Sequence, residues 1–218
     1  MLSRPILFDL DGTLTDPKPG ITRSIIYALE RMGHESLSED ELTWCIGPPI
    51  QESFAKILDT EDPAALSKAV GLYRERFTET GLFENEVYPH IRSVLATLRD
   101  LGHILYVATS KPAPFAERIV RHFEIHRFFA HVYGSELDGT RSNKAELVAH
   151  ILHQEGLRSG VMIGDRRQDI DAAQKNQLAS IGVLYGYGSQ QELTDAGADE
   201  LAADPADILL ALARLPSQ

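Results

Sequence analysis

The stretch Phe8-Asp9-Leu10-Asp11-Gly12-Thr13-Leu14-Thr15-Asp16 decides the fold, because it joins an apolar run to two closely spaced carboxylates and a glycine. The run Ile6-Leu7-Phe8 predicts a buried strand. In an extended chain, residues i and i+2 point the same way, so Asp9 and Asp11 would project together from its end. Gly12 lets the chain turn tightly. Such an acidic pair is costly without a cation between them; the alternative is a turn with solvated aspartates.

Further apolar runs follow and predict more buried strands. They lie at 104–108, 161–163 and 181–184, with a weaker run at 128–132. Near-continuous apolar strands are typical of a parallel sheet that is covered on both faces. Helical spacing at 91–101, 145–152 and 208–215 separates them. Alternating strands and helices predict an α/β, doubly wound fold.

One long interval, residues 17–84, breaks this alternation because it reads as helices only. Helices are expected at 21–31, after a capping box at 38–41, around 54–58 and at 63–77. Pro17, Pro19 and Gly20 mark the first junction, and 81–89 marks the second. We therefore expect a catalytic core of residues 1–16 and 85–218, with a helical cap at 17–84. The alternative is one continuous α/β domain with a helical excursion.

Three more segments combine strand ends with chemically useful side chains. Gly164-Asp165-Arg166-Arg167-Gln168-Asp169 places two carboxylates after a strand and before a helix, where they would suit Mg²⁺ or cap the helix. Val107-Ala108-Thr109-Ser110-Lys111-Pro112 places two hydroxyls before a helix start, where an anion could bind. Lys144 is expected in a first helical turn, where it opposes the helix dipole and invites another reason for its presence.

Composition excludes several classes of partner. The 218-residue chain carries a formal net charge of −11 with scattered basic residues, so no nucleic acid polymer is expected. No stretch approaches the roughly 20 apolar residues of a membrane span. The first residues do not read as a signal peptide, and the single cysteine, Cys45, permits no internal disulfide, so a cytoplasmic protein is expected. An anionic substrate would need local positive charge from a metal ion and cationic side chains.

Taken together, these motifs resemble those of the haloacid dehalogenase superfamily of phosphohydrolases, in order and over nearly the whole chain. The resemblance implies a Rossmann-like parallel-sheet core with a C1-type helical cap inserted after strand one. It also implies a Mg²⁺-dependent phosphatase that hydrolyses a small phosphate monoester through an aspartyl-phosphate intermediate. The motifs that carry it are Asp9-x-Asp11-Gly12-Thr13, Thr109-Ser110-Lys111, Lys144 and Gly164-Asp165-x-x-x-Asp169.

The same resemblance implies a role for each motif residue. Asp9 would be the nucleophile, and Asp11 would protonate the leaving group and then activate water. Dehalogenase members lack a carboxylate at the second position, so Asp11 favours phosphate substrates. The remaining roles are metal binding by the Asp9 side chain, the Asp11 backbone carbonyl and Asp165; phosphate binding by Thr109, the Ser110 backbone N–H and Lys144; and support by Thr13 and Asp169.

Within the superfamily, the chain resembles the phosphoglycolate phosphatase-like branch and, more closely, its 5′-nucleotidase subgroup. Nucleoside 5′-monophosphates are therefore the expected substrates, and phosphoglycolate or another small organic phosphate is the alternative. The residues that carry this match are Ile46-Gly47-Pro48-Pro49 with Ser53-Phe54, Glu84-Asn85 with Val87-Tyr88-Pro89, and Tyr185-Gly186-Tyr187-Gly188. The chain departs from its relatives at His90 and Ala172, where Gly is frequent, and at Gln177, where Asn-Gly is usual.

Substrate choice would depend on the expected cap. The loop at 46–50 is uncharged and stiffened by prolines, which suits a nucleoside better than the carboxylate of phosphoglycolate. Trp44, Phe54 and Tyr187 are candidates to line a base site, whereas Arg23 or Arg74 could reverse the preference.

Other classes stay open or are disfavoured. A phosphomutase would use the same core, and a phosphonate-cleaving relative would need a cap lysine, for which Lys18, Lys56 and Lys68 are available. A non-catalytic module is disfavoured by the complete motif set. A NAD-binding domain and a P-loop nucleotide triphosphatase are disfavoured because their glycine-rich motifs are absent. The oligomeric state is not predicted.

Overall fold

The computed structural model describes residues 4–35 and 37–216. The chain divides into two compact units, one formed by residues 1–16 and 87–218 and the other by Pro17–Glu86. We call them unit 1 and unit 2 and describe each by itself. Within the described ranges, no helix has the length and apolar character that crossing a membrane requires.

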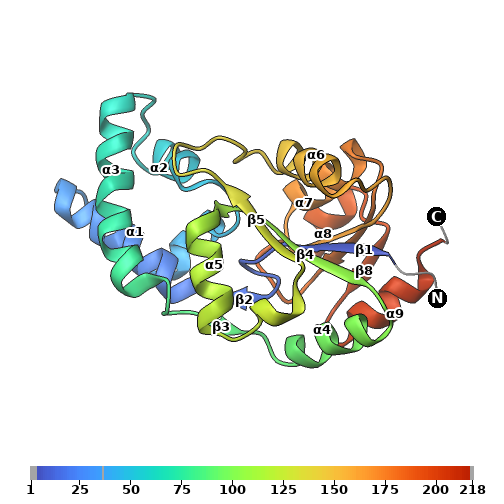
Figure 1. Cartoon of the computed structure of the whole chain (residues 1–218). Coiled ribbons are helices and arrows are strands. Elements are labelled where there is room, and N and C mark those ends of the chain that lie inside the picture. The colour runs from blue at the N-terminus through green and yellow to red at the C-terminus, as the bar shows by residue number, and fades with distance from the viewer. Residues whose placement is uncertain (1–3, 36, 217–218) are drawn as a thin grey trace. The chain divides into compact units, whose positions relative to one another are not determined.

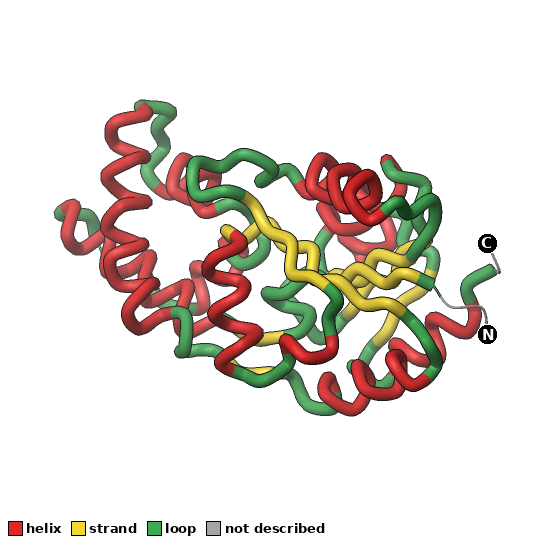
Figure 2. The backbone as a smooth tube through the Cα atoms, viewed as in Figure 1, coloured by secondary structure: helices red, strands yellow, loops and turns green. Residues whose placement is uncertain are grey.

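Unit 1 contains a six-stranded parallel sheet, which confirms the predicted α/β fold class (Figures 1 and 2). Its strand order is β5-β4-β1-β6-β7-β8, so β1 is central and consecutive strands lie on either side of it. The carboxyl ends of parallel strands meet at one edge of such a sheet, and ligands bind there. The strands are β1 (Pro5–Phe8), β4 (Ile104–Pro112), β5 (His131–Ser135), β6 (Val161–Gly164), β7 (Ala179–Val183) and β8 (Glu200–Ala202).

Helices cover both faces of this sheet (Figure 1). On one face, α6 (Lys144–Glu155) and α7 (Arg167–Lys175) pack with Leu7, Tyr106 and Met162 of the strands. On the other lie α4 (Ile91–Asp100) and α9 (Asp207–Arg214). The other helices of unit 1 are α5 (Ala113–His122), the 3-10 helix η3 (His126–Phe128) and α8 (Gln190–Asp195).

The positions of the strands refine the sequence prediction. The four stronger apolar runs are strands, but the weaker run at 128–132 was placed too early. Phe128 ends the 3-10 helix η3, and β5 begins only at His131. The three-residue strand β8 was not predicted, because Glu200–Ala202 has no apolar run. Two further short strands, β2 (Thr15–Asp16) and β3 (Glu86–Val87), form a separate two-stranded sheet.

Unit 2 is helical, as the sequence indicates. It comprises α1 (Lys18–Met32), the 3-10 helix η1 (Asp40–Cys45), α2 (Ile50–Ile57), α3 (Pro63–Arg76) and the π-helical turn η2 (Phe77–Gly81). The capping box is present, since Glu41 accepts hydrogen bonds from Ser38, but it precedes a 3-10 helix. A Cβ atom on Gly20 would lie 2.0 Å from the Gly81 carbonyl oxygen, so α1 and η2 require glycine where they meet.

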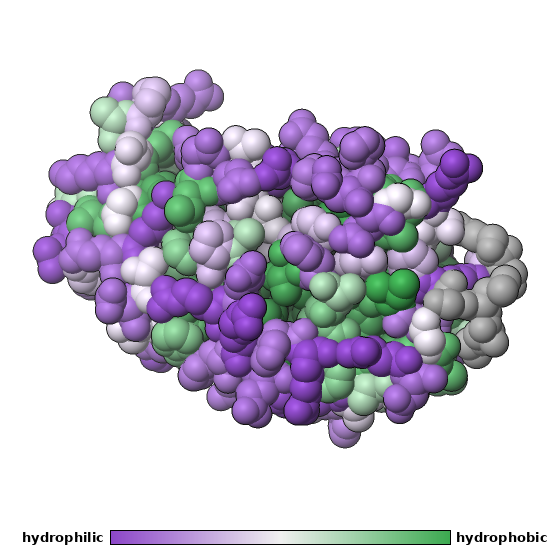
Figure 3. All heavy atoms as spheres, in the orientation of Figure 1, coloured by the Kyte–Doolittle hydropathy of each residue, from purple (hydrophilic) through white to green (hydrophobic). Residues whose placement is uncertain are grey.

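The face of the molecule in Figure 3 is mostly hydrophilic, in keeping with the net charge of −11. Large apolar side chains that are exposed number few among the described residues and are spread over both units. They are Trp44, Phe83, Leu101, Ile104, Leu137 and Leu210.

Two of the departures noted above occupy left-handed backbone, His90 with φ 66° and Gln177 with φ 57°. Gln177 follows α7 in a Schellman arrangement, in which its N–H donates to Gln174 and that of Leu178 donates to Ala173. Left-handed backbone costs a residue with a Cβ atom about 1–2 kcal/mol, and glycine avoids most of this. This explains why relatives favour glycine here.

We predict that Gln177→Gly raises the free energy of unfolding by about 0.5–1 kcal/mol, because it relieves the left-handed strain. The measurement is urea unfolding followed by circular dichroism. Lys175→Gly, two residues earlier in α7, is the matched control and should destabilise by about 1 kcal/mol. A loss of stability in Gln177→Gly would contradict the strain argument.

Candidate active site

A tight turn after β1 positions the first two carboxylates. The backbone N–H groups of Thr13, Leu14 and Thr15 all donate to the Leu10 carbonyl oxygen, at 3.3, 2.9 and 3.0 Å. Gly12 adopts φ 84°, and a Cβ atom there would lie 2.3 Å from Asp165 Oδ2. This position therefore demands glycine for both conformation and space. Within the turn, Asp9 and Asp11 are buried, at 3 % and 5 % exposure.

Asp9 lies in a cluster of buried carboxylates with Asp165 and Asp169. One carboxylate oxygen from each lies within 4.8 Å of the others. Asp165 follows β6, the neighbour of β1, and Asp169 lies in the first turn of α7. Asp169 Oδ2 also accepts from the Arg166 N–H at 3.1 Å, so this carboxylate caps α7 as well as facing the cluster. The sequence alternative of helix capping is thus correct for Asp169, in addition to its place in the cluster.

Lys144 supplies positive charge to this cluster. Its Nζ atom lies 2.7 Å from Asp9 Oδ1, 2.9 Å from Asp169 Oδ1 and 2.9 Å from the Ala108 carbonyl oxygen. Lys144 is the first residue of α6, which Asn143 caps through hydrogen bonds from Ala145 and Glu146. Burial alone would lower the pKa of Lys144, but the charges of Asp169 and Asp9 outweigh it and raise the pKa. The lysine is therefore a permanent cation, which explains its unfavourable place at a helix start.

Asp165 is held by the loop that follows β7. The Tyr187 N–H donates to Asp165 Oδ2 at 2.8 Å, and Thr13 Oγ1 donates to Oδ1 at 3.4 Å. Burial and the charges of Asp9 and Asp169 raise the pKa of Asp165 well above its ordinary value. Burial likewise raises the pKa of Asp169, although Lys144 opposes this shift. An added cation would therefore favour the charged form of these carboxylates.

Glycines make room for this arrangement. A Cβ atom on Gly186 would lie 2.3 Å from the Gly12 carbonyl oxygen and 2.4 Å from Asp165 Cβ. One on Gly188 would lie 1.9 Å from the Asp165 carbonyl oxygen, and one on Gly164 would lie 2.2 Å from Asp169 Cγ. The Tyr-Gly-Tyr-Gly segment thus packs directly on the acidic residues.

Asp11 pairs with a lysine to which the sequence analysis gave no role. Lys111 Nζ lies 2.7 Å from Asp11 Oδ1, and the two side chains are only 6 % and 8 % exposed. Burial raises the pKa of Asp11, while Lys111 opposes the shift. Lys111 belongs to the quoted Thr-Ser-Lys motif, so the available signal was its place two residues after Thr109 at a strand end.

The predicted phosphate-binding residues Thr109 and Ser110 lie near the end of β4, beside β1. Val107 is the register partner of Phe8, so Thr109 extends two residues beyond it toward the carboxyl edge. Thr109 Oγ1 accepts from the Lys111 N–H at 3.2 Å, and the Ser110 carbonyl oxygen accepts from Ser135 Oγ at 2.9 Å. The strand end therefore has a defined local conformation.

Three tyrosines border the motif-one turn and were not predicted as a group. Tyr185 donates its hydroxyl to the Thr13 carbonyl oxygen at 2.9 Å, and its ring meets Tyr88 edge to face with centroids 4.9 Å apart. Tyr187 donates its hydroxyl to Asp16. The sequence signal was the Tyr-Gly-Tyr-Gly segment, noted only as a resemblance.

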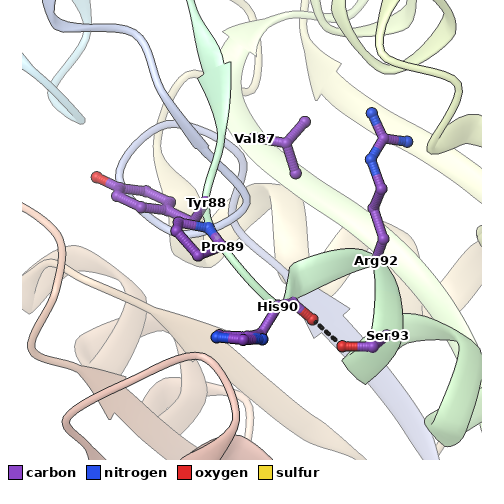
Figure 4. Close-up of a pocket in the computed structure, with 6 residues that line it drawn as sticks. All are labelled: Val87, Tyr88, Pro89, His90, Arg92 and Ser93. Atoms are coloured by element: carbon purple, nitrogen blue, oxygen red, sulfur yellow. Dashed lines mark hydrogen bonds between the residues drawn. The ribbon is translucent and has the colours of Figure 1, made fainter.

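A pocket of about 400 Å³ is lined by Val87, Tyr88, Pro89, His90, Arg92 and Ser93 (Figure 4). Ser93 Oγ donates to the His90 carbonyl oxygen at 2.7 Å and fixes the start of α4. None of the predicted site residues lines this pocket. It is therefore distinct from the carboxylate cluster, although Tyr88 belongs to both surroundings through its contact with Tyr185.

Comparison with known proteins agrees with the geometry. A sequence profile described as haloacid dehalogenase-like hydrolase matches residues 6–183. The chain is 51 % identical over 190 residues to a 5′-nucleotidase of Pseudomonas aeruginosa, covering 86 % of both, and 27 % identical to a phosphoglycolate phosphatase of Vibrio cholerae, covering 94 % of both. It is 38 % identical to the tyrosine-protein kinase PtkA of Mycobacterium tuberculosis, but spans only 62 % of that protein.

A solved structure gives the same result. The crystal structure of a predicted phosphatase from Clostridium acetobutylicum superimposes with a TM-score of 0.94 and 38 % identity, covering 99 % of this chain and 100 % of that one. The chain belongs to the haloacid dehalogenase-like hydrolase family. Within it, the chain is a phosphatase similar to 5′-nucleotidases.

We predict that Gly186→Ala lowers kcat/KM of the phosphatase reaction by about 100-fold, because the added methyl displaces Asp165 or the motif-one turn, and small misplacements of reacting groups are that costly. The matched control is Gly71→Ala in α3, where a Cβ atom meets nothing within 4 Å. The control should keep full activity and gain up to about 1 kcal/mol of stability. Wild-type activity in folded Gly186→Ala would show that the segment does not position the site.

Proposed function

We propose that the protein is a Mg²⁺-dependent phosphatase that forms an aspartyl-phosphate at Asp9 and acts on nucleoside 5′-monophosphates. The observation that carries the catalytic part is the buried contact of Lys144 with Asp9 and Asp169, next to Asp165. A carboxylate fixed by an ammonium group at a sheet edge is a nucleophile of the kind that takes up phosphoryl groups. Asp11, two residues on, is near enough in the chain to exchange protons with the reacting oxygens.

The reaction would proceed in two displacements. A carboxylate oxygen of Asp9 attacks phosphorus, the bond to the leaving oxygen breaks, and that oxygen takes a proton from Asp11. Asp11 then removes a proton from water, whose oxygen attacks phosphorus and frees Asp9 and inorganic phosphate. Burial, which raises the pKa of Asp11, helps it to carry the proton needed in the first step. Lys144 neutralises charge on the phosphoryl oxygens, with Thr109 and the Ser110 N–H as further donors.

The acidic residues fit a hard divalent cation. Oxygen donors from Asp9 and Asp165, with the Asp11 carbonyl, are of the type that Mg²⁺ prefers. Bound there, Mg²⁺ would offset the repulsion between the carboxylates and a phosphate dianion. The charges also agree, because the described site carries a formal charge of −2 from Asp9, Asp11, Asp165, Asp169, Lys111 and Lys144.

We predict that dialysis against EDTA abolishes activity and that added Mg²⁺ restores it. Mg²⁺ should also raise the melting temperature without substrate, because a ligand of the folded state alone stabilises it. Asp165→Asn should lose this thermal shift. Full activity after chelation, or a melting temperature indifferent to Mg²⁺ in the wild type, would contradict the metal assignment.

Nucleotide preference rests on similarity and on the chemistry of unit 2. The 51 % identical relative is a 5′-nucleotidase, whereas the phosphoglycolate phosphatase relative is 27 % identical. Arg23, a possible partner for the carboxylate of phosphoglycolate, is engaged by Glu39 at 2.8 Å and Glu84 at 3.3 Å. Trp44 is 39 % exposed and available for a base, whereas Phe54 packs on Tyr73 in the core of unit 2. We therefore drop Phe54 as a candidate.

We predict that kcat/KM for the best of AMP, GMP, CMP and UMP exceeds that for phosphoglycolate at least tenfold, about 1.4 kcal/mol of transition-state preference. Phosphate release at matched pH and Mg²⁺ measures this. Phosphoglycolate ahead of every nucleotide by tenfold would establish the second candidate, phosphoglycolate phosphatase, instead. The cap role of unit 2 and the cytoplasmic location stay predictions.

A further inference from the structure

We propose that Lys111 is a positioning residue for Asp11, and that it fixes which carboxyl oxygen exchanges protons with the leaving group and with water. The proposal rests on the proposed function, since it concerns how Asp11 works in that reaction. It starts from a feature the phosphatase roles above do not use: a second buried lysine in the site, 2.7 Å from Asp11 Oδ1.

The contact has a definite chemical effect. An ammonium group that donates to Oδ1 restricts rotation of the carboxyl group and disfavours a proton on that oxygen. The transferable proton then resides on Oδ2. Proton transfer is efficient only when the donor oxygen lies within hydrogen-bond reach of its partner, so fixing the carboxyl group determines how well Asp11 can act.

The backbone around Lys111 is fixed by several independent contacts. The Lys111 N–H donates to Thr109 Oγ1 at 3.2 Å, and Ser135 Oγ donates to the Ser110 carbonyl oxygen at 2.9 Å. The pairing of β4 with β5 shifts register between Thr109 and Pro112. At the shift, a Cβ atom on Gly134 would lie 2.4 Å from the Lys111 carbonyl oxygen, so this neighbour must be glycine.

Lys144 gives a useful contrast. Both lysine side chains are buried, at 6 % exposure for Lys111 and 4 % for Lys144. Lys144 contacts Asp9 and Asp169, whereas Lys111 contacts Asp11. The two cations are thus divided between the proposed nucleophile and the proposed acid, and their removal should affect different parts of the reaction.

The test uses the leaving group. p-Nitrophenolate leaves without a proton near neutral pH, whereas an alkoxide needs one. The two substrates are p-nitrophenyl phosphate and whichever of AMP and phosphoglycolate the wild type hydrolyses faster. For Lys111→Met, we expect kcat/KM for the alkyl phosphate to fall about 100-fold, the size of a general-acid contribution, and that for p-nitrophenyl phosphate to fall less than tenfold.

Three comparisons sharpen this result. Lys111→Arg keeps a cationic donor and should retain alkyl phosphate hydrolysis within about tenfold of wild type. Adding Lys111→Met to Asp11→Asn should cause no further loss, because the group to be positioned is already gone. Lys175→Met, an exposed lysine of α7, removes the same charge and should behave as wild type. Thermal unfolding checks that each variant is folded.

Other outcomes would overturn the proposal. Equal losses for both substrates in Lys111→Met, with a raised KM, would make Lys111 a phosphate-binding residue. Unchanged kinetics would make the ion pair merely structural. Failure of the proposed function is seen separately, as a wild-type enzyme that releases no phosphate from any of these substrates.

Discussion

The structure of unit 1 depends on the burial of several carboxylates at one edge of a parallel sheet. Carboxylates without water or a counter-charge are costly, and mutual repulsion adds to that cost. Lys144 offsets part of it by contacting both Asp9 and Asp169 within 2.9 Å. Burial still raises the pKa of Asp165, so the charged form of the cluster is not fully compensated by this lysine alone. The site is thus prepared for a further cation.

Much of the surrounding structure can be understood as a consequence of that burial. Gly12, Gly164, Gly186 and Gly188 all approach Asp165 or Asp169 so closely that a side chain would collide with them. The Tyr187 N–H and the Arg166 N–H each donate to one of these carboxylates. The backbone therefore replaces water around the acids, which is how a buried site can remain both dry and electrostatically organised.

The sequence was sufficient for the location of the site but not for its internal pairing. Asp9, Asp11 and Asp165 follow apolar runs, and the parallel sheet brings such strand ends to one edge. The pairing of Lys111 with Asp11 joins positions 100 residues apart, and a single lysine carries little signal by itself. The run at 128–132 was misplaced because apolar residues there serve a 3-10 helix as well as a strand. Strand β8 owes its existence to pairing with β7, which local sequence does not reveal.

The central claim is that Asp9 becomes covalently phosphorylated, and chemical trapping tests it most directly. The enzyme is quenched in acid during turnover, reduced with borohydride, digested, and analysed by peptide mass spectrometry. Reduction of an acyl phosphate converts the aspartate to homoserine. The account predicts homoserine at position 9, dependent on substrate and found at no other carboxylate. An unmodified Asp9 in enzyme quenched while it is releasing phosphate, under conditions that trap a control acyl phosphate, would contradict it.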